Sequence, residues 1–191
     1  MIMTSNDEYF AYLQRRSRLG AFYRTHWLYP RLTRWLVGRT LDVGCGIGDM
    51  LDFRKDTVGV DMNPHTVAFC NARGAQAHLM ASDTLPFDAA AFHSALLDNV
   101  LEHLLEPAPL LGEVRRVLRP AGRLLVGVPG QKGWDSDPDH KVRYDEDTLA
   151  ETVTRSGFRH LETFHMPLFR SQWLDRSMRQ YCIYAAFERR D

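Results

Sequence analysis

Hydrophobic positions along the chain fall into short runs that are separated by longer amphipathic stretches. Short apolar runs rich in β-branched residues favour buried strands, and the stretches between them favour helices. The pattern predicts strands at 40–44, 57–61, 77–81, 93–98, 123–128, 158–164 and 181–188. It predicts helices near 48–54, 64–73, 100–105, 108–118 and 146–156. This alternation indicates an α/β fold, a doubly wound and mostly parallel sheet with helices on both faces.

Local signals mark several helix ends. Asn63 followed by Pro64 is typical of a helix start, with Asn63 as the N-cap. Asp147-Thr148 and Gly157 bracket the helix predicted at 146–156. The helix after the first strand has room for little more than two turns before the next strand begins.

The first predicted strand runs directly into a glycine-rich turn, LDVGCGIG at 41–48. Its pattern is D-x-G-x-G-x-G, formed by Asp42, Gly44, Gly46 and Gly48. Glycines let the backbone approach a ligand without an intervening Cβ. The second strand ends in Asp61, whose carboxylate can accept hydrogen bonds from two ribose hydroxyls. Together these features predict a nucleoside-cofactor site at the carboxyl edge of the sheet.

The spacing of the glycines distinguishes between cofactors. The dinucleotide fingerprint G-x-G-x-x-G would require a third glycine where Asp49 stands. An acid at that helix N-terminus would repel a pyrophosphate. A cofactor that carries an ammonium group instead of a phosphate suits an acid such as Asp42.

Taken in order, the motifs resemble those of the class I S-adenosylmethionine-dependent methyltransferases, over about residues 40 to 165. The glycine turn resembles the first motif of that family, and ASDTLPF at 81–87 resembles the third. Residues 92–103 look like the fourth strand and its turn, and residues 113–126 like the helix, turn and fifth strand of many small-molecule methyltransferases. The resemblance implies a Rossmann-like seven-stranded sheet whose last strand is antiparallel.

The resemblance also implies which residues hold S-adenosylmethionine. They are Asp42, Gly44, Gly46, Gly48, Asp61, Met62, Asp83, Thr84, Leu85, Asp98 and Asn99. The glycines would line the amino-acid end with Asp42 behind them, and Asp61 would hold the ribose. Met62 and Leu85 would sandwich the adenine, while Asp83, next to Thr84, would accept a hydrogen bond from its amine. Asp98 and Asn99 would border the methionine moiety.

The methyl acceptor is expected beyond the carboxyl ends of the strands, where residues 98–103, 129–144 and the N-terminal segment should converge. Methyl transfer requires alignment of the acceptor and removal of its proton. His103 and His140 are the candidates for that deprotonation, or for positioning the acceptor. The alternative is structural: His103 could pack at a helix end, and His140 could order its own loop.

A metal site is a more specific alternative role for the residues around His103 and His140. Asn99, Glu102, His103 and His140 resemble the metal-binding pattern of the small-RNA 2′-O-methyltransferases. The first position of that pattern is an acid, and Asn99 replaces it here. An amide binds a divalent cation less well than a carboxylate does, so no metal is expected from the sequence.

Composition narrows the functional class. The 191 residues carry 24 basic and 24 acidic side chains, so the charge does not favour nucleic-acid binding. The three cysteines are widely spaced, which fits a reducing compartment. The chain shows no signal-peptide pattern and no apolar run of transmembrane length. We therefore expect a cytoplasmic protein.

Residues 1–39 differ from the core at 40–191 and are predicted to form a helical lid of one or two helices, broken at Pro30. Arginines and aromatic residues alternate along this segment. They could bind an acidic acceptor, or they could form an amphipathic helix that packs its aromatics on the sheet. The segment could also pair across a dimer, so monomer and homodimer both remain open.

The sequence thus predicts methyl transfer from S-adenosylmethionine to an oxygen, nitrogen or carbon atom of a small or medium-sized acceptor. One alternative is a cofactor-binding regulatory domain without activity. A nicotinamide-dependent oxidoreductase is another, against which Asp49 argues.

Overall fold

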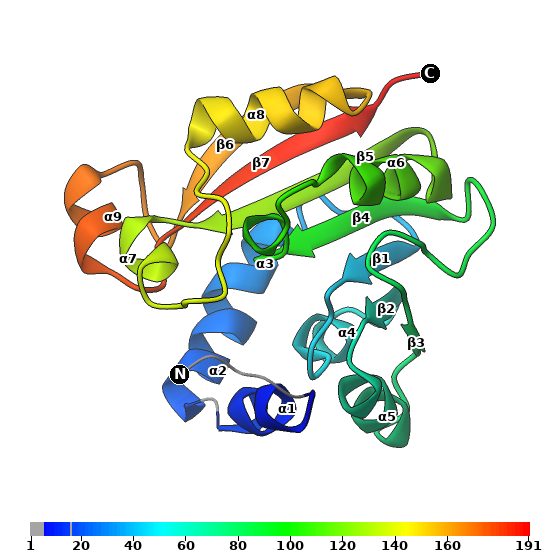
Figure 1. The fold of residues 1–191 in the computed structure, drawn as a ribbon, viewed down its shortest axis with the longest axis horizontal. Coiled ribbons are helices and arrows are strands. Elements are labelled where there is room, and N and C mark those ends of the chain that lie inside the picture. The colour runs from blue at the N-terminus through cyan, green and yellow to red at the C-terminus, as the bar shows by residue number, and fades with distance from the viewer. Residues whose placement is uncertain (1–5, 16) are drawn as a thin grey trace.

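Seven strands form one mixed sheet in the order β3-β2-β1-β4-β5-β7-β6 (Figure 1). The computed structural model describes residues 6–15 and 17–191. The strands are β1 (Thr40–Val43), β2 (Thr57–Asp61), β3 (Ala77–Leu79), β4 (Phe92–Asp98), β5 (Leu118–Pro129), β6 (Phe158–Met166) and β7 (Cys182–Arg189). Neighbours from β3 to β5 run parallel, whereas β7 is antiparallel to both β5 and β6. The predicted fold class is confirmed.

The helices connect these strands and flank the sheet. In the N-terminal region they are α1 (Asn6–Gln14), α2 (Arg18–Tyr23), the π-helical turn η1 (Arg24–Leu28) and α3 (Tyr29–Leu32). Within the core they are α4 (Asp49–Phe53), α5 (Pro64–Ala72), the short 3-10 helix η2 (Leu101–His103), α6 (Ala108–Val117), α7 (Gln131–Trp134), α8 (Glu146–Arg155) and α9 (Gln172–Ser177). Asn63 caps α5 as predicted, because its side chain accepts a hydrogen bond from the His65 amide at 2.9 Å.

The central strands are buried on both faces, which explains their nearly continuous apolar sequence. Successive side chains of a strand point to opposite faces. In β4, Ala95 and Leu97 belong to the larger core cluster with α6 and α8, whereas Leu96 belongs to a second cluster with α3. Helices α6 and α8 therefore cover one face, and the N-terminal region covers the other (Figure 1).

The N-terminal region breaks at a different place from the one predicted. Helical structure runs from Arg18 to Leu32 and passes through Pro30. A proline inside a helix removes one donor and crowds the carbonyl four residues earlier. Here the wider π turn lies just before it, and the Tyr29 amide donates to the Arg24 carbonyl five residues back. The break falls instead after α1, where Ser17 caps α2 through a 3.1 Å bond from the Gly20 amide.

Other differences arise in the connections. Helices α7 and α9 occupy connections for which the sequence pattern predicted no helix. Strand β5 begins at Leu118, where the sequence predicts the end of a helix, because Leu118 pairs with Phe92 ahead of the main register. The segment predicted as a helix at 100–105 contains only η2.

Candidate active site

A cavity of about 540 Å³ opens at the carboxyl ends of β1 and β4, where the strand order reverses. Its lining includes the N-terminal helices, the turn after β4 and the segment after β5, together with the glycine turn and the start of β7. The predicted convergence of these segments is confirmed. Of the predicted site residues, the lining contains Asp42, Gly44, Gly46, Asp98, Asn99, His103 and His140.

The glycine turn is held by backbone geometry that excludes side chains. Gly44 has a φ of +73°, and a Cβ there would lie 2.8 Å from a methyl group of Val100. The amides of Gly44 and Cys45 both donate to the Val60 carbonyl, at 2.8 and 3.0 Å. Gly48, with a φ of +80°, is the N-cap of α4 and lies outside the cavity lining.

Asp61, the last residue of β2, links the glycine turn to that strand through hydrogen bonds. One carboxylate oxygen accepts a hydrogen bond from the Gly46 amide, and the other accepts one from the Asn63 amide, each at 2.8 Å. The side chain is buried and lies behind the glycine turn. Its two oxygens each retain a further lone pair for a ligand hydroxyl.

Two acidic side chains, Asp42 and Asp98, lie at the floor of the cavity. Burial, with Asp98 and Asp61 as nearby charges, raises the pKa of the buried Asp42 carboxyl well above its ordinary value. Asp98 accepts a 2.8 Å hydrogen bond from the hydroxyl of Tyr184 in β7. A cationic ligand placed here would offset this repulsion.

Tyr184 is a site residue that sequence reasoning missed. A Cβ at Gly127 of β5 would collide with the Tyr184 ring and would lie 2.8 Å from an oxygen of Asp98. The glycine therefore makes room for the bond between Tyr184 and Asp98. A glycine inside an apolar strand often marks such a close approach, and Gly127, between Val126 and Val128, was the available signal.

Asp49 meets an arginine from the N-terminal region. The Arg24 guanidinium lies 2.8 Å from the Asp49 carboxylate, and both residues line the cavity. This ion pair joins the first turn of α4 to the helix that covers it.

The residues predicted to hold the adenine lie outside the cavity lining. Met62 is 57% exposed, and Asp83 and Thr84 are also exposed. Leu85 differs, since its side chain is buried in the larger core cluster and supports this edge of the sheet from within. The adenine contacts therefore stay predictions.

The N-terminal helices form one wall of the cavity and are attached at two places. Leu13, Tyr23 and Tyr29 are among the lining residues. Helix α1 lies on α5, where the Asn6 carbonyl accepts a 2.7 Å bond from the Asn63 amide group and Phe10 packs edge-on against Phe69. Further along, Leu28, Tyr29, Leu32 and Leu36 are buried against the sheet.

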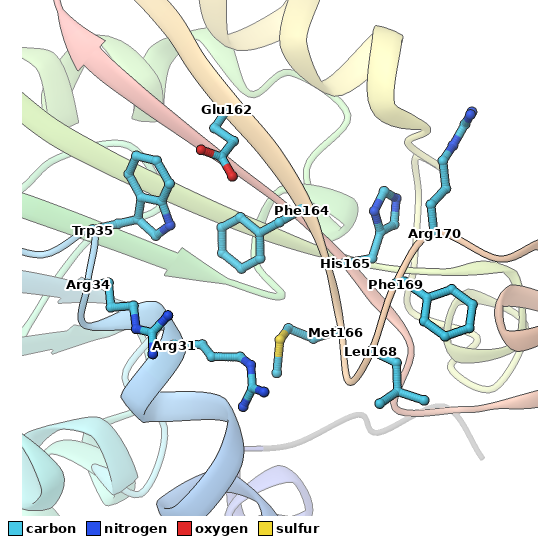
Figure 2. Close-up of a pocket in the computed structure, with 10 residues that line it drawn as sticks. All are labelled: Arg31, Arg34, Trp35, Glu162, Phe164, His165, Met166, Leu168, Phe169 and Arg170. Atoms are coloured by element: carbon cyan, nitrogen blue, oxygen red, sulfur yellow. The ribbon is translucent and has the colours of Figure 1, made fainter.

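A second cavity, of about 520 Å³, lies between the end of the N-terminal region and β6 (Figure 2). Arg31, Arg34 and Trp35 line one side, and Phe164 and Met166 lie on the other. The rings of Trp35 and Phe164 stack at a centroid distance of 6.2 Å. Met166 also lines the first cavity, so the two cavities share a wall.

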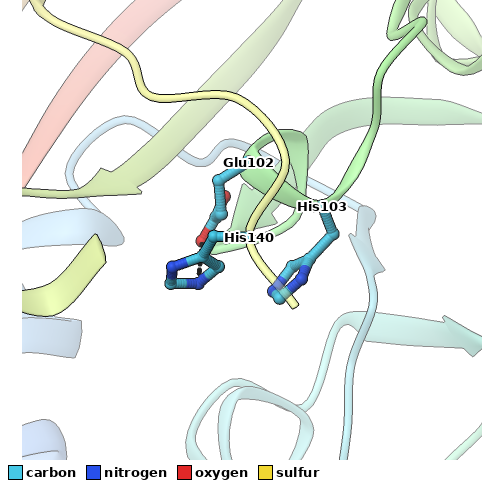
Figure 3. A group of neighbouring side chains, drawn as sticks. All are labelled: Glu102, His103 and His140. Carbon is cyan, nitrogen blue, oxygen red and sulfur yellow. Dashed lines mark ion pairs between the residues drawn. The ribbon is translucent and has the colours of Figure 1, made fainter. Parts of the chain in front are cut away.

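Glu102, His103 and His140 meet beside the first cavity, whose lining includes the two histidines (Figure 3). The ring centroids of the two histidines are 4.8 Å apart. Partial desolvation, and then the neighbouring His140, lower the pKa of His103 below its ordinary value. Burial raises the pKa of the Glu102 carboxyl to about 8. Two residues expected at the acceptor thus come together with a buried acid.

Comparison with known proteins agrees with this geometry. Residues 41–126 match the family model described as a methyltransferase domain. Over 150 residues the chain is 31% identical to a probable S-adenosylmethionine-dependent methyltransferase of Mycolicibacterium smegmatis, covering 72% of this chain and 58% of that protein. The chain spans less than two thirds of its curated relatives, and only 30% of one from Streptomyces fradiae.

Solved structures show the same fold at low identity. A methyltransferase from Archaeoglobus fulgidus superposes with a TM-score of 0.66 at 18% identity, covering 89% of this chain and all of that one. The 4+2 cyclase SpnF superposes with a TM-score of 0.70 at 20% identity, covering 92% of this chain and 83% of that one. Within the part of the chain that the structure describes, no helix is long and apolar enough to cross a membrane. The family model, the mycobacterial relative and the sheet order together place this chain in the class I S-adenosylmethionine-dependent methyltransferase family.

Proposed function

We propose that the protein transfers a methyl group from S-adenosylmethionine to an oxygen, nitrogen or carbon atom of a small or medium-sized acceptor. The observation that carries this proposal is the pairing of the glycine turn with two carboxylates, Asp42 and Asp98, at the floor of the cavity. S-adenosylmethionine is positively charged at its ammonium group and at its sulfonium. A floor of carboxylates attracts both charges, whereas it would repel a phosphate.

In this proposal the cofactor extends across the carboxyl edge of the sheet. Its amino-acid end lies on Gly44 and Gly46, and Asp98, held by Tyr184, borders the methionine moiety. Asp61 receives the ribose hydroxyls beside the glycine turn. The adenine lies further out, toward Met62, Asp83 and Thr84, with Leu85 beneath that edge.

The chemistry is an in-line displacement at the sulfonium. The acceptor atom forms a bond to the methyl carbon as the bond from carbon to sulfur breaks, and the sulfur leaves as a neutral thioether. An acceptor that carries a proton on that atom loses it. His103 and His140 face the cavity on this side and could take the proton or align the acceptor.

The acceptor is proposed to be acidic or to carry an acidic group. Arg31 and Arg34 line the second cavity, which shares Met166 with the first. An acceptor whose reactive end lies near His103 could place a carboxylate or phosphate toward these arginines. The N-terminal helices would then act as a lid.

Two other functions are tested by the same experiments. A nicotinamide-dependent oxidoreductase would place a pyrophosphate at the start of α4, where Asp49 stands. A regulatory domain without activity would bind cofactor and transfer nothing. The cyclase SpnF illustrates that a related fold need not carry the same activity.

Calorimetric titration with S-adenosylhomocysteine tests the proposal. We expect one site per chain with micromolar affinity, and at least a tenfold loss in Asp61→Asn, because one oxygen becomes an NH2 group that can accept neither from a turn amide nor from a ribose hydroxyl. Asp147→Asn on α8 is the control and should bind normally. If NADH binds and S-adenosylhomocysteine does not, the proposal is wrong; if the cofactor binds but no single-turnover transfer occurs in an acceptor screen, the regulatory alternative is favoured.

A further inference from the structure

Glu102 is a buried carboxyl group whose oxygens lack hydrogen-bond partners among the described residues. Its side chain is 0% exposed. Among the residues that the structure describes, neither of its oxygens accepts a hydrogen bond of ordinary geometry. Burying an unpaired carboxylate is costly, so a buried acid is normally paired, hydrogen-bonded or bound to a metal.

His140 directs its Nε2 atom at this carboxyl group. Its Nδ1 lies 2.9 Å from the Trp134 carbonyl, which can only accept, so Nδ1 carries the hydrogen. In the neutral ring the other nitrogen, Nε2, then carries the lone pair, and it lies 3.9 Å from Oε1 of Glu102 (Figure 3). That distance is too long for a direct hydrogen bond. Histidines that bind a metal through one nitrogen usually donate the other N–H to a backbone carbonyl or a carboxylate, and the bond from His140 to Trp134 fits that arrangement.

His103 supplies a third donor from the same short helix as Glu102. One ligand atom from each of Glu102, His103 and His140 lies within 4.8 Å of the others. Two imidazole nitrogens and one carboxylate oxygen form a donor set that suits zinc, cobalt, iron or manganese, whereas magnesium prefers oxygen ligands. Ligands around a zinc ion lie about 3.3 Å apart for bonds of about 2.05 Å, so small side-chain rotations would close the site.

We infer that Glu102, His103 and His140 bind one divalent transition-metal ion at the acceptor side of the cavity. Asn99, whose replacement of an acid led the sequence analysis to expect no metal, is not required for this set. Its side-chain amide donates to Asp98 at 3.2 Å instead. The three remaining groups come together without it.

The place of the cluster indicates what the ion would do. His103 and His140 line the cavity, and Glu102 lies buried behind them. The open coordination positions would therefore face the acceptor. Resting on the proposed function, this assigns the acceptor to compounds that present an oxygen ligand, such as a hydroxyl whose proton a bound cation makes easier to remove.

The test is direct metal binding to the full chain, purified without a histidine tag and freed of metal with a chelator. Calorimetric titrations with ZnCl₂ and CoCl₂ should each give one site per chain, with affinity well above that for MgCl₂. The bound cobalt should show visible absorption bands of a nitrogen- and oxygen-ligated ion. Sulfur-to-cobalt charge-transfer bands would place the ion on a cysteine and overturn the inference.

Variants locate the site. His103→Ala changes an exposed side chain and should preserve the fold, as measured by near-ultraviolet circular dichroism. We expect it and Glu102→Gln to lower zinc affinity at least tenfold, while His160→Ala, an exposed histidine on β6, binds normally. Unchanged affinity in His103→Ala would contradict the inference.

Titration of the metal-free protein with S-adenosylhomocysteine separates the two proposals. Cofactor binding without stoichiometric metal binding would overturn the metal site alone. Metal binding at these residues without cofactor binding would support the metal site and overturn the proposed function.

Discussion

At the scale of single residues, the site depends on positions where a side chain would obstruct the fold. Gly44 combines a left-handed backbone conformation with a close neighbour, since an added Cβ would meet Val100 at 2.8 Å. Gly74 has a similar φ of +81° with open space around it, and Gly112 lies in α6 with open space and ordinary helical backbone. Substitutions at these three glycines can therefore distinguish the cost of backbone strain from the cost of a steric clash.

Alanine at each position should give a graded result. Gly44→Ala should lower the free energy of unfolding by more than about 2 kcal/mol, since strain and collision add. Gly74→Ala should cost about 1–2 kcal/mol from strain alone, and Gly112→Ala should gain about 0.5–1 kcal/mol. Urea unfolding measures all three. Equal losses at Gly44 and Gly74 would show that Val100 moves aside at little cost.

At the scale of elements, the N-cap of helix α8 lies two residues before the predicted start signal at Asp147. Asp147-Thr148 marked the start, but the N-cap is Asp145, whose carboxylate accepts a 2.8 Å bond from the Thr148 amide. The Thr148 hydroxyl in turn accepts a bond from the Asp145 amide at 2.9 Å. Three acids in succession at 145–147 offered several possible caps, and only the backbone geometry distinguishes them.

Removal of this cap should have a pH-dependent effect. Hydrogen bonds from Thr148 lower the pKa of the Asp145 carboxyl, so its contribution is present above the ordinary aspartate pKa and is lost as the pH falls through the lowered value. Asp145→Ala should cost about 1 kcal/mol at pH 7, and the difference from the natural protein should vanish in strong acid. Asp147→Ala, which keeps the cap, is the control. A difference that persists at low pH would contradict the assignment.

At the scale of the whole molecule, the N-terminal region has two parts with different roles. Leu28, Leu32 and Leu36 belong to the core, whereas α1 rests on α5 through Phe10, Phe69 and a few polar contacts. The interpretation as an amphipathic helix that packs on the sheet therefore suits the part that contains Leu28, Leu32 and Leu36. The proposal of a lid suits α1. Their separation makes the lid testable without unfolding the core.

Deletion of residues 1–16 should lower the melting temperature only slightly, because Leu28, Leu32, Leu36 and the Ser17 cap of α2 remain, although the buried Leu13 is lost. Dissociation of S-adenosylhomocysteine should become at least tenfold faster, since Leu13 and Arg15 no longer line the cavity. Stopped-flow displacement measures this rate. Phe10→Ala, which removes only the contact with Phe69, should give a smaller effect in the same direction. An unchanged dissociation rate would show that α1 does not close the site.

The order of the strands along the chain, the edge that carries the glycine turn and the segments that meet there were all predictable from local sequence. Strand periodicity and the D-x-G-x-G-x-G turn are local, and parallel strands bring their carboxyl ends to one edge regardless of the details. The helix cap at Asn63 was predictable for the same reason, since the cap and the amide it binds are two residues apart.

Contacts between residues far apart in the sequence became visible in the folded chain alone. Tyr184 and Asp98 are 86 residues apart, and their bond depends on the register between β5 and β7. Glu102 meets His140 because the backbone of residues 141 and 142 donates to the Glu102 carbonyl and carries His140 over the buried carboxylate. The hydrophobic pattern along a chain indicates which face of an element a residue occupies, but contacts between distant elements depend on packing. In this protein the packing brings Tyr184 to Asp98 and assembles the proposed metal site.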